Sequence, residues 1–216
     1  MFATAVLPGR IKTLERIGRI VGPEPFYLAG GTAVALHLGH RLSHDFDFFS
    51  PAEFDVAALR DTLAAGGSFQ FGSAARQTLH GTFDGVKVSF LYYRPPLLAK
   101  PLNLSGVDVA LLSDLAPIKL DTVGSRGSKK DFYDLYFIAR EAFPLDQVFA
   151  LYRRKFSYLD VSIRHLLLSL TYFEDAERTG GEIILLKPAS WEDVKAFFIA
   201  AAGELLRRFR AEDPDS

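Results

Sequence analysis

The chain has 216 residues, of which 49% are hydrophobic and 24% are charged, and its formal net charge at pH 7 is −1. This composition suits one substantial core, or a mid-sized domain with a smaller one packed against it, and it argues against disorder. Because the chain contains no cysteine, disulfides, thiolate metal sites and a cysteine nucleophile are excluded.

The charge balance and hydropathy narrow the choice of partners and location. With a net charge of −1, any nucleic acid contact must come from a local patch rather than from a global field. No stretch approaches the roughly 18 apolar residues of a membrane span, and the N-terminus lacks the pattern of a signal peptide. We therefore expect a cytoplasmic protein without a membrane partner.

The N-terminal part alternates helical and strand patterns. Apolar residues at three- and four-residue spacing predict a helix over residues 8–21, ended by Gly22 and Pro23. A short apolar run, FYLAG (26–30), predicts a strand that stops at a glycine pair, and the helix formers of TAVALHLGH (32–40) follow. The expected order is strand, tight turn, helix.

Further strands and one more helix are expected before residue 113. The segment HDFDFF, from His44, has the period-two pattern of a strand that should lie beside the first one. Residues 55–65 predict a helix that stops at Gly66-Gly67, and several short strands follow. The dipeptide Asp84-Gly85 is a strong signal for a two-residue hairpin.

Everything after residue 113 has helical patterns. Ser113-Asp114 is expected to cap the first helix, and Ser190 the last, with Asp193 at its third position. The predicted helices span residues 114–125, 129–141, 145–155, 160–177 and 190–210. We expect an α+β fold, with a mixed β-sheet flanked by helices in residues 1–112 and a helical C-terminal part, residues 113–216, packed on that core.

The block AGGTAVALHLGHRLSHDFDFF (29–49) contains a candidate phosphate site. Gly30 and Gly31, between a strand and a helix, allow the backbone amides to approach a ligand closely, and the helix N-terminus adds partial positive charge. Thr32 could cap the helix and offer its hydroxyl to a phosphate, and Arg41, at the far end of the helix, could reach a triphosphate. A glycine pair alone is more often only a turn.

Asp45 and Asp47 form a candidate metal site. Their spacing on a predicted strand puts both side chains on one face, about one pleat apart, where two carboxylates can share a divalent ion. Mg²⁺ prefers oxygen ligands and keeps part of its coordination shell for substrate phosphates, as phosphoryl or nucleotidyl transfer requires. A solvated strand edge is the plain alternative for this pattern.

A second block of charged residues, APIKLDTVGSRGSKKDFYDLYFIAR, spans residues 116–140. Lys119 lies on a predicted helix and Arg126 lies in the glycine-bounded turn that follows. Asp131 and Asp134 are three residues apart on the next helix, so they share a face. A solvated helix with mixed charges explains this block equally well when it is taken alone.

Together the two blocks resemble the AbiEii/AbiGii-toxin nucleotidyltransferase family. GGTAVALHLGHRLSHDFDFF is similar to its GG-[ST] … R-x-S-x-D-x-D-F signature, and KLDTVGSRGSKKDFYDLYF to its K … R … [KR]-D-x-x-D-[LI]-Y segment. The later LTYFEDAE is also similar to one branch of that family. The resemblance covers roughly residues 26–140 and implies a fold like that of DNA polymerase β.

The resemblance also implies site residues, cofactors and partners. Asp45 and Asp47 would bind Mg²⁺ or Mn²⁺, and Lys119 and Asp131 would complete the catalytic site. An NTP would be bound by Gly30, Gly31, Thr32, Arg41, Ser43, Lys119 and Arg126, with Lys130 and Asp134 in support. The implied reaction transfers a nucleoside monophosphate to an RNA, such as tRNA, or to a protein. Some members are toxins whose antitoxin is encoded beside them.

One departure from the polymerase-β pattern affects catalysis. Such enzymes usually carry a third carboxylate on a later central strand, whereas the candidate strand VKVSF (86–90) has Lys87 and Ser89. Asp84 belongs to the expected turn. Asp131 could act in its place as a base or metal partner, or it could hold Lys119. A nucleotide- or partner-binding module without catalysis is therefore the alternative function.

Two other enzyme classes are alternatives to this interpretation. A helix continuing through His44 would align His37, His40 and His44 as a zinc site. The dipeptide His44-Asp45 is similar to the His-Asp pair of metal phosphohydrolases. The strand expected from residue 45 argues against both. The sequence has no Walker motif, no G-x-G-x-x-G and no G-x-S-x-G, so kinase, dinucleotide-binding and serine hydrolase functions have little support.

Overall fold

The computed structural model describes residues 1–22, 24–178 and 181–212. Pro23, expected to help end the first helix, lies outside the described residues. The chain divides into two compact units, Met1–Leu115 and Ala116–Ser216. Helix α4 (Leu112–Ser125) begins in the first unit and ends in the second. A boundary at residue 112 and the packing of the helical part on the core stay predictions.

The first unit is a mixed sheet with helices. Its elements are η1 (Ala3–Ala5), α1 (Arg10–Val21), β1 (Tyr27–Ala29), α2 (Gly30–Leu38), β2 (Phe46–Ser50), α3 (Val56–Gly66), β3 (Phe69–Ala75), β4 (Thr78–Phe83), β5 (Val86–Tyr92), β6 (Leu102–Leu104) and β7 (Val107–Val109). Within the described residues the seven-stranded sheet has the order β3-β4-β5-β2-β1-β7-β6. β2 lies beside β1, as expected, and pairs with it antiparallel, whereas β2–β5 and β1–β7 are parallel.

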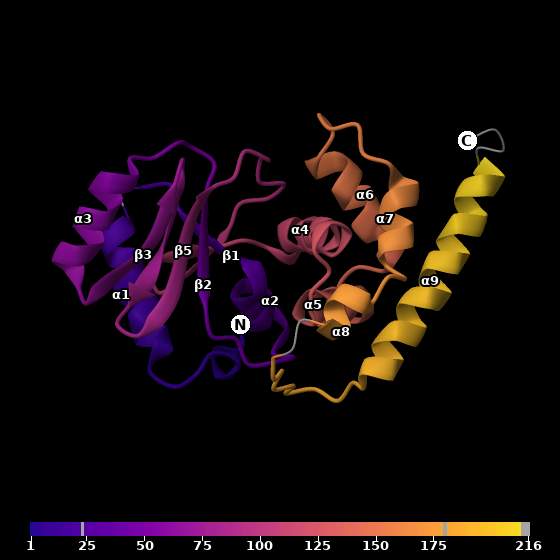
Figure 1. The fold of residues 1–216 in the computed structure, drawn as a ribbon, viewed down its shortest axis with the longest axis horizontal. Helices are drawn as coiled ribbons and strands as arrows, with labels where there is room; N and C mark the ends of the chain where they lie inside the picture. Colours follow the sequence, from indigo (N-terminus) through magenta and orange to yellow (C-terminus); the bar gives the residue numbers. More distant parts are fainter. Residues whose placement is uncertain (23, 179–180, 213–216) are drawn as a thin grey trace. The chain divides into compact units, whose positions relative to one another are not determined.

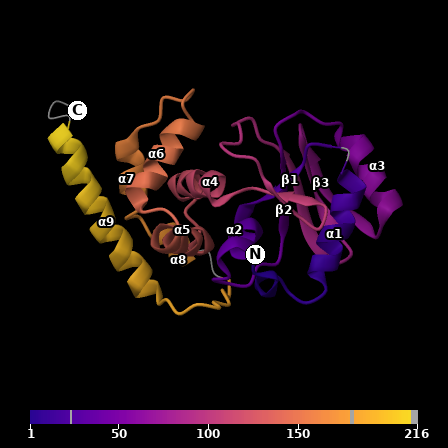
Figure 2. The same cartoon turned by 180° about the vertical axis from the view of Figure 1, so that it is seen from behind.

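One part of the core of this unit lies on the face of the sheet that carries a row of apolar side chains. Strand alternation puts Leu28, Phe48, Phe90 and Leu79 in one buried row across β1, β2, β5 and β4. Helices α1 and α3 cover this face, and α2 lies on the other side of the sheet (Figures 1 and 2). Fully burying a side chain of this size contributes roughly 1.5–3 kcal/mol. The opposite face carries Asp47 and Ser89, which are only half-buried.

Local sequence signals set several of these elements. The Asp55 carboxylate accepts hydrogen bonds from the amides of Ala57 and Ala58 and so begins α3. Asp84 and Gly85 both have positive φ, +48° and +78°, and close a two-residue β4–β5 hairpin in which Phe83 pairs with Val86. The hairpin expected from this dipeptide is therefore confirmed.

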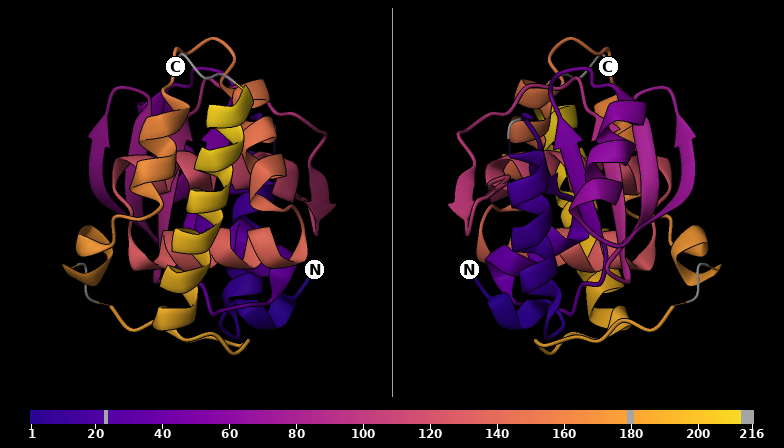
Figure 3. Two further views of the ribbon diagram at one scale, coloured as in Figure 1. Left: turned by 90° about the vertical axis from the view of Figure 1, so that its right-hand side faces the viewer. Right: turned by 90° about the vertical axis from the view of Figure 1, so that its left-hand side faces the viewer.

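The second unit is helical. After α4 it contains α5 (Lys129–Glu141), α6 (Leu145–Lys155), α7 (Ile163–Ser169), α8 (Glu174–Arg178) and α9 (Trp191–Glu212). Ser190 and Asp193 exchange side chain to backbone hydrogen bonds, so the expected cap of the last helix is confirmed. The long helix α9 contacts α5 and α7 (Figure 3). Phe132 packs against Phe173, Trp191 and Phe198 at the centre of these helices.

Two expectations about the helices were wrong. The single helix predicted over residues 160–177 is broken between α7 and α8, because the Thr171 amide and hydroxyl both bond to the Leu168 carbonyl and close a turn. Asp114 does not cap α4, since it lies inside the first turn and accepts hydrogen bonds from the amides of Leu98 and Ala99. Among the described residues, no helix combines the length and the hydropathy needed to span a membrane.

Candidate functional site

The glycine pair starts helix α2 directly, without a separate turn between strand and helix. Ala29 is the N-cap and Gly30 the first helical residue. Gly30 has φ +63°, and a Cβ at this position would lie 2.5 Å from Oδ2 of Asp47. Glycine is required here for two reasons, the backbone conformation and the close approach to the carboxylate. The predicted phosphate turn and one predicted metal ligand therefore lie side by side.

Thr32 differs from the expectation. It does not cap α2, because it lies in the first turn of the helix and is 1% exposed. Its hydroxyl forms hydrogen bonds with Oγ of Ser43, at 2.8 Å, and with the carbonyl oxygen of Asp45. These bonds tie the helix to the chain that enters β2, so Thr32 positions Asp45 from within the core. A direct contact of Thr32 or Ser43 with phosphate stays a prediction.

Asp45 and Asp47 take different backbone positions. Asp47 lies in β2, opposite Ala29 of β1, whereas Asp45 is exposed and immediately precedes the strand. Two carboxylates provide the hard oxygen donors that suit Mg²⁺, which keeps other positions for phosphates and water. Within the described part of the chain, no group of three or more His, Asp or Glu side chains is placed to hold a metal ion. An ion held by these two carboxylates would take its remaining ligands from phosphates and water.

Arg41 is not at the end of the helix. α2 stops at Leu38, with Gly39 in the left-handed conformation, so Arg41 lies three residues beyond it. Its side chain is 3% exposed, and Nη1 donates to the carbonyl of Leu42 at 3.1 Å. Arg41 is therefore part of the buried structure of residues 40–43. A contact between its side chain and a triphosphate stays a prediction.

Ser89 lies where the resemblance to polymerase β would lead us to expect a third carboxylate. β5 runs parallel to β2, and Ser89 is the direct partner of Asp47. Lys87, two residues before it on the same face, is exposed. VKVSF is thus part of a strand of the sheet next to β2, and its comparison with a third catalytic strand stays a prediction. The residue opposite Asp47 carries a hydroxyl, not a carboxylate.

Lys119, Asp131 and Asp134 form a buried ionic cluster in the second unit. Nζ of Lys119, on α4, lies 2.8 Å from Oδ1 of Asp131 and 2.8 Å from Oδ2 of Asp134, both on α5. All three side chains are nearly inaccessible, with 7%, 4% and 0% of their surface exposed. The shared helix face predicted for the two aspartates is confirmed. This geometry favours a role for Asp131 in holding Lys119 over a role as a base or metal partner.

The charge state of Asp131 follows from its neighbours. Burial alone would raise the pKa of its carboxyl, but the charge and hydrogen bond of Lys119 and the hydroxyl of Ser128 outweigh it and lower the pKa. The carboxylate therefore stays ionised and is a weak base. Arg126 adds a longer contact, 3.8 Å from its Nε to Oδ2 of Asp131. Lys130 is exposed on α5, and its supporting role stays a prediction.

Arg126 also lines a groove in the second unit. The groove has a volume of about 470 Å³ and lies between the end of α4 and α7. The Arg126 side chain is 73% exposed, and His165 and Tyr172 lie on the same groove. The arginine predicted to contact the nucleotide is therefore accessible, unlike Lys119.

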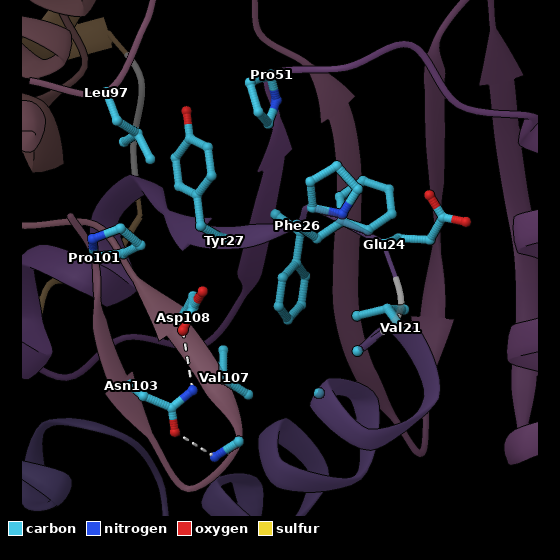
Figure 4. A pocket seen from close by; sticks show the side chains of 15 residues that line it. Val21, Glu24, Phe26, Tyr27, Pro51, Leu97, Pro101, Asn103, Val107 and Asp108 are labelled. Atoms are coloured by element: carbon cyan, nitrogen blue, oxygen red, sulfur yellow. Dashed lines mark hydrogen bonds between the residues drawn. The ribbon is translucent and has the colours of Figure 1, made fainter. Parts of the chain in front are cut away.

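A pocket of about 300 Å³ lies at the beginning of β1, away from the glycine pair that follows its end (Figure 4). Phe26, Tyr27 and Val107 supply apolar walls, and Asn103 donates a hydrogen bond to Asp108 at 3.0 Å. The buried Tyr27 hydroxyl has no hydrogen-bond partner among the described residues. Burial, with the nearby charge of Asp114, raises the pKa of Tyr27. None of the predicted site residues lines this pocket.

The alternative sites built from histidines were wrong. α2 ends at Leu38, so the helix that would align His37, His40 and His44 does not exist. Nε2 of His37 instead lies 2.8 Å from the carbonyl oxygen of Ala110, and His40 is fully buried. Among the described residues, neither these three histidines nor His44 and Asp45 belong to a group of three side chains that could hold a metal ion.

Comparisons with known proteins identify the family of the chain. Residues 12–103 match the family of the nucleotidyl transferase AbiEii toxin of type IV toxin–antitoxin systems. An uncharacterized protein of Aquifex aeolicus (strain VF5) is 38% identical over 200 residues, covering 90% of this chain and 95% of its own length. The chain belongs to the AbiEii nucleotidyltransferase toxin family.

Solved structures show that the fold is that of nucleotidyltransferases. The chain is similar to MenT4, a nucleotidyltransferase toxin of Mycobacterium tuberculosis, with a TM-score of 0.60 and 17% identity, covering 89% of this chain and 82% of that one. It is also similar to a Helicobacter pylori protein proposed to be a nucleotidyltransferase, with a TM-score of 0.54 and 15% identity, covering 96% and 99%. The expected polymerase-β-like α+β fold is confirmed. These two solved structures share the fold with the chain at low sequence identity.

Proposed function

We propose that the chain is a divalent-metal-dependent nucleotidyltransferase that transfers a nucleoside monophosphate from an NTP to an RNA, such as tRNA, or to a protein. The observation that carries this proposal is the close approach of Gly30 to Asp47, which brings the backbone at the start of α2 beside a carboxylate. Family membership supports the same reaction class.

The residues of the first unit have distinct proposed roles. The amides at Gly30 and Gly31 bind phosphate oxygens at the N-terminus of α2. Asp45 and Asp47 hold the divalent ion, which when bound polarises the phosphate oxygens of the nucleotide. Thr32 keeps Asp45 in place through its bonded carbonyl. These roles use only groups that the first unit brings together.

The second block of charged residues, 116–140, has a supporting role in this proposal. Lys119 is too buried to be a mobile phosphate ligand, so it holds α4 and α5 together through Asp131 and Asp134. Arg126, with its exposed guanidinium, is the better candidate for an NTP contact. The approach of this block to the glycine turn remains a prediction.

Transfer of label from α-³²P NTPs to RNA and protein fractions, with Mg²⁺ or a chelator, tests the function. Label in one fraction that requires the metal supports the proposal and identifies the acceptor. Binding of NTP without transfer to any fraction favours the second candidate, a nucleotide- or partner-binding module, which the serine opposite Asp47 supports.

Family membership also supports a biological role as the toxin of a toxin–antitoxin system. Expression in a bacterial host should then slow growth, and co-expression of a gene that neighbours this one should restore it. Growth that is unchanged by expression of the wild type, with transfer activity present in the same cells, would contradict the toxin role alone.

A further inference from the structure

Three strands align Asp47 with a histidine. Ser89 of β5 is the direct partner of Asp47 of β2, and His80 of β4 is the direct partner of Ser89. Directly paired residues of neighbouring strands point to the same face of a sheet. Asp47, Ser89 and His80 therefore form one polar row, on the face opposite the apolar row of Phe48, Phe90 and Leu79.

Ser89 fixes the imidazole of His80. Nδ1 of His80 lies 3.1 Å from Oγ of Ser89. The His80 side chain is exposed, and helices α1 and α3 cover the other face of the sheet (Figure 1). One ring nitrogen is thus engaged by Ser89, and the ring remains accessible on the face that carries Asp47.

Few charged groups surround this histidine. On β5 the charged neighbour on the same face is Lys87, and on β2 it is Asp47, with Asp45 just before the strand. The nearest residues of β4 on that face are Thr78 and Thr82. Its partner on β3 is Ser73, and no residue of Phe69–Ala75 is titratable.

His80 is not placed as a further metal ligand. Within the described chain it belongs to no group of three His, Asp or Glu side chains that could hold an ion. Neighbouring strands are about 4.8 Å apart, so the Cα atoms of Asp47 and His80 are about 10 Å apart, with Ser89 between them. That span leaves room for a phosphate at Asp47 and a hydroxyl group next to His80.

We propose that His80, positioned by Ser89, accepts the proton of the attacking acceptor hydroxyl and so replaces the carboxylate that is absent from β5. The inference rests on the proposed transferase function. In this proposal the imidazole carries its proton on Nδ1 and donates it to Oγ of Ser89, and Nε2 is the proton acceptor. Asp131, buried and ionically bound to Lys119, is not needed as the base.

Atoms and electrons balance in this step. The acceptor O–H bond breaks, its proton moves to Nε2 of His80, and the oxygen forms a bond with the α-phosphorus of the NTP. The bond from that phosphorus to the bridging oxygen breaks, and its electron pair leaves with pyrophosphate. A correctly placed general base contributes about 10²–10⁴-fold to the rate.

Single-turnover transfer from labelled NTP, measured from acid to alkaline pH, tests this role. His80→Gln should lose about 10²–10⁴-fold in rate while its affinity for the NTP is unchanged. The fall in wild-type rate toward acid pH, where a protonated imidazole cannot accept a proton, should disappear in this variant. Ser89→Ala should lose less, and added imidazole should partly restore His80→Ala. Gln70→Ala, at an exposed residue of β3, is the control.

The outcomes distinguish the proposed role of His80 from the proposed transferase function. If His80→Gln transfers at the wild-type rate with the same pH profile, His80 is not the base, although the protein remains a transferase. If the wild type binds NTP and transfers nothing, the proposed function fails and the role of His80 fails with it. Lost activity without rescue by imidazole and without a changed pH profile would assign His80 a structural role and overturn the proposal.

Discussion

Gly30 lies so close to Asp47 that a Cβ at this glycine would come within 2.5 Å of the carboxylate oxygen Oδ2. The contact joins the first turn of α2 to the middle of the sheet, next to the point where β1 and β2 pair. The backbone that we propose to bind phosphate and the side chain that we propose to bind the metal ion are thereby held at a fixed separation.

Gly30→Ala tests this contact. The positive φ of +63° should cost about 1–3 kcal/mol of unfolding free energy, and the methyl group should also displace Asp47 and weaken NTP binding. Gly85→Ala is the matched control, because Gly85 has φ +78° but a methyl group there would meet nothing within 4 Å. Denaturant unfolding and nucleotide titration should show strain in both variants and weaker binding only in Gly30→Ala. Equal NTP affinity in both would contradict the account.

Thr32→Val should disturb Asp45 from inside the core. The change removes hydrogen bonds to Ser43 and to the Asp45 carbonyl, and leaving buried polar groups unpaired costs about 1–3 kcal/mol. We expect lower stability in urea and weaker metal-dependent NTP binding. Thr62→Val, which removes an exposed hydroxyl bond to Ala58, should change neither by a comparable amount. Full NTP affinity in Thr32→Val would show that this residue does not position the site.

Lys119→Met should be among the most destabilising single changes in the second unit. It would leave the carboxylates of Asp131 and Asp134 buried without their cation, a loss that typically costs about 3–5 kcal/mol. Lys187→Met removes a cation from a more exposed pair with Glu141 and should cost about 1 kcal/mol or less. Equal unfolding free energies for the two variants would mean that the buried cluster does not hold α4 against α5.

Asp131 should make stability depend on pH in the acid range. Because its folded-state pKa is lowered from 3.8, its contribution to stability is complete above that value and is lost as pH falls through the lower folded pKa. The difference in unfolding free energy between wild type and Asp131→Asn should therefore shrink on acidification. A difference that is constant down to acid pH would contradict the ionised state of Asp131.

Much of the fold could be predicted from local patterns. The helices Lys129–Glu141 and Leu145–Lys155 match their predicted bounds because apolar spacing and clear boundary residues mark them. The break at Thr171 was missed because a side chain that bonds to its own backbone competes with the helix without changing the apolar pattern. Sequence spacing likewise cannot show that Thr32 faces inward.

The polar row is predictable only in part. The two-residue turn at Asp84-Gly85 fixes the register of β4 and β5, so the pairing of His80 with Ser89 follows from a local signal. The parallel pairing of β5 with β2 joins segments that are separated in the sequence by a helix and a hairpin, and no local pattern sets it. That non-local register is what brings Asp47 into the row.

The measurement that tests the central claim most directly is the rate of nucleotide transfer by Asp47→Asn, compared with wild type and with Asp61→Asn. The account predicts that Asp47→Asn loses more than about 100-fold in Mg²⁺-dependent transfer, because a ligand of the reacting complex is removed. Its circular dichroism and unfolding should stay close to wild type, and Asp61→Asn should keep its activity. Wild-type transfer by Asp47→Asn, with the fold intact, would contradict the assignment of this site.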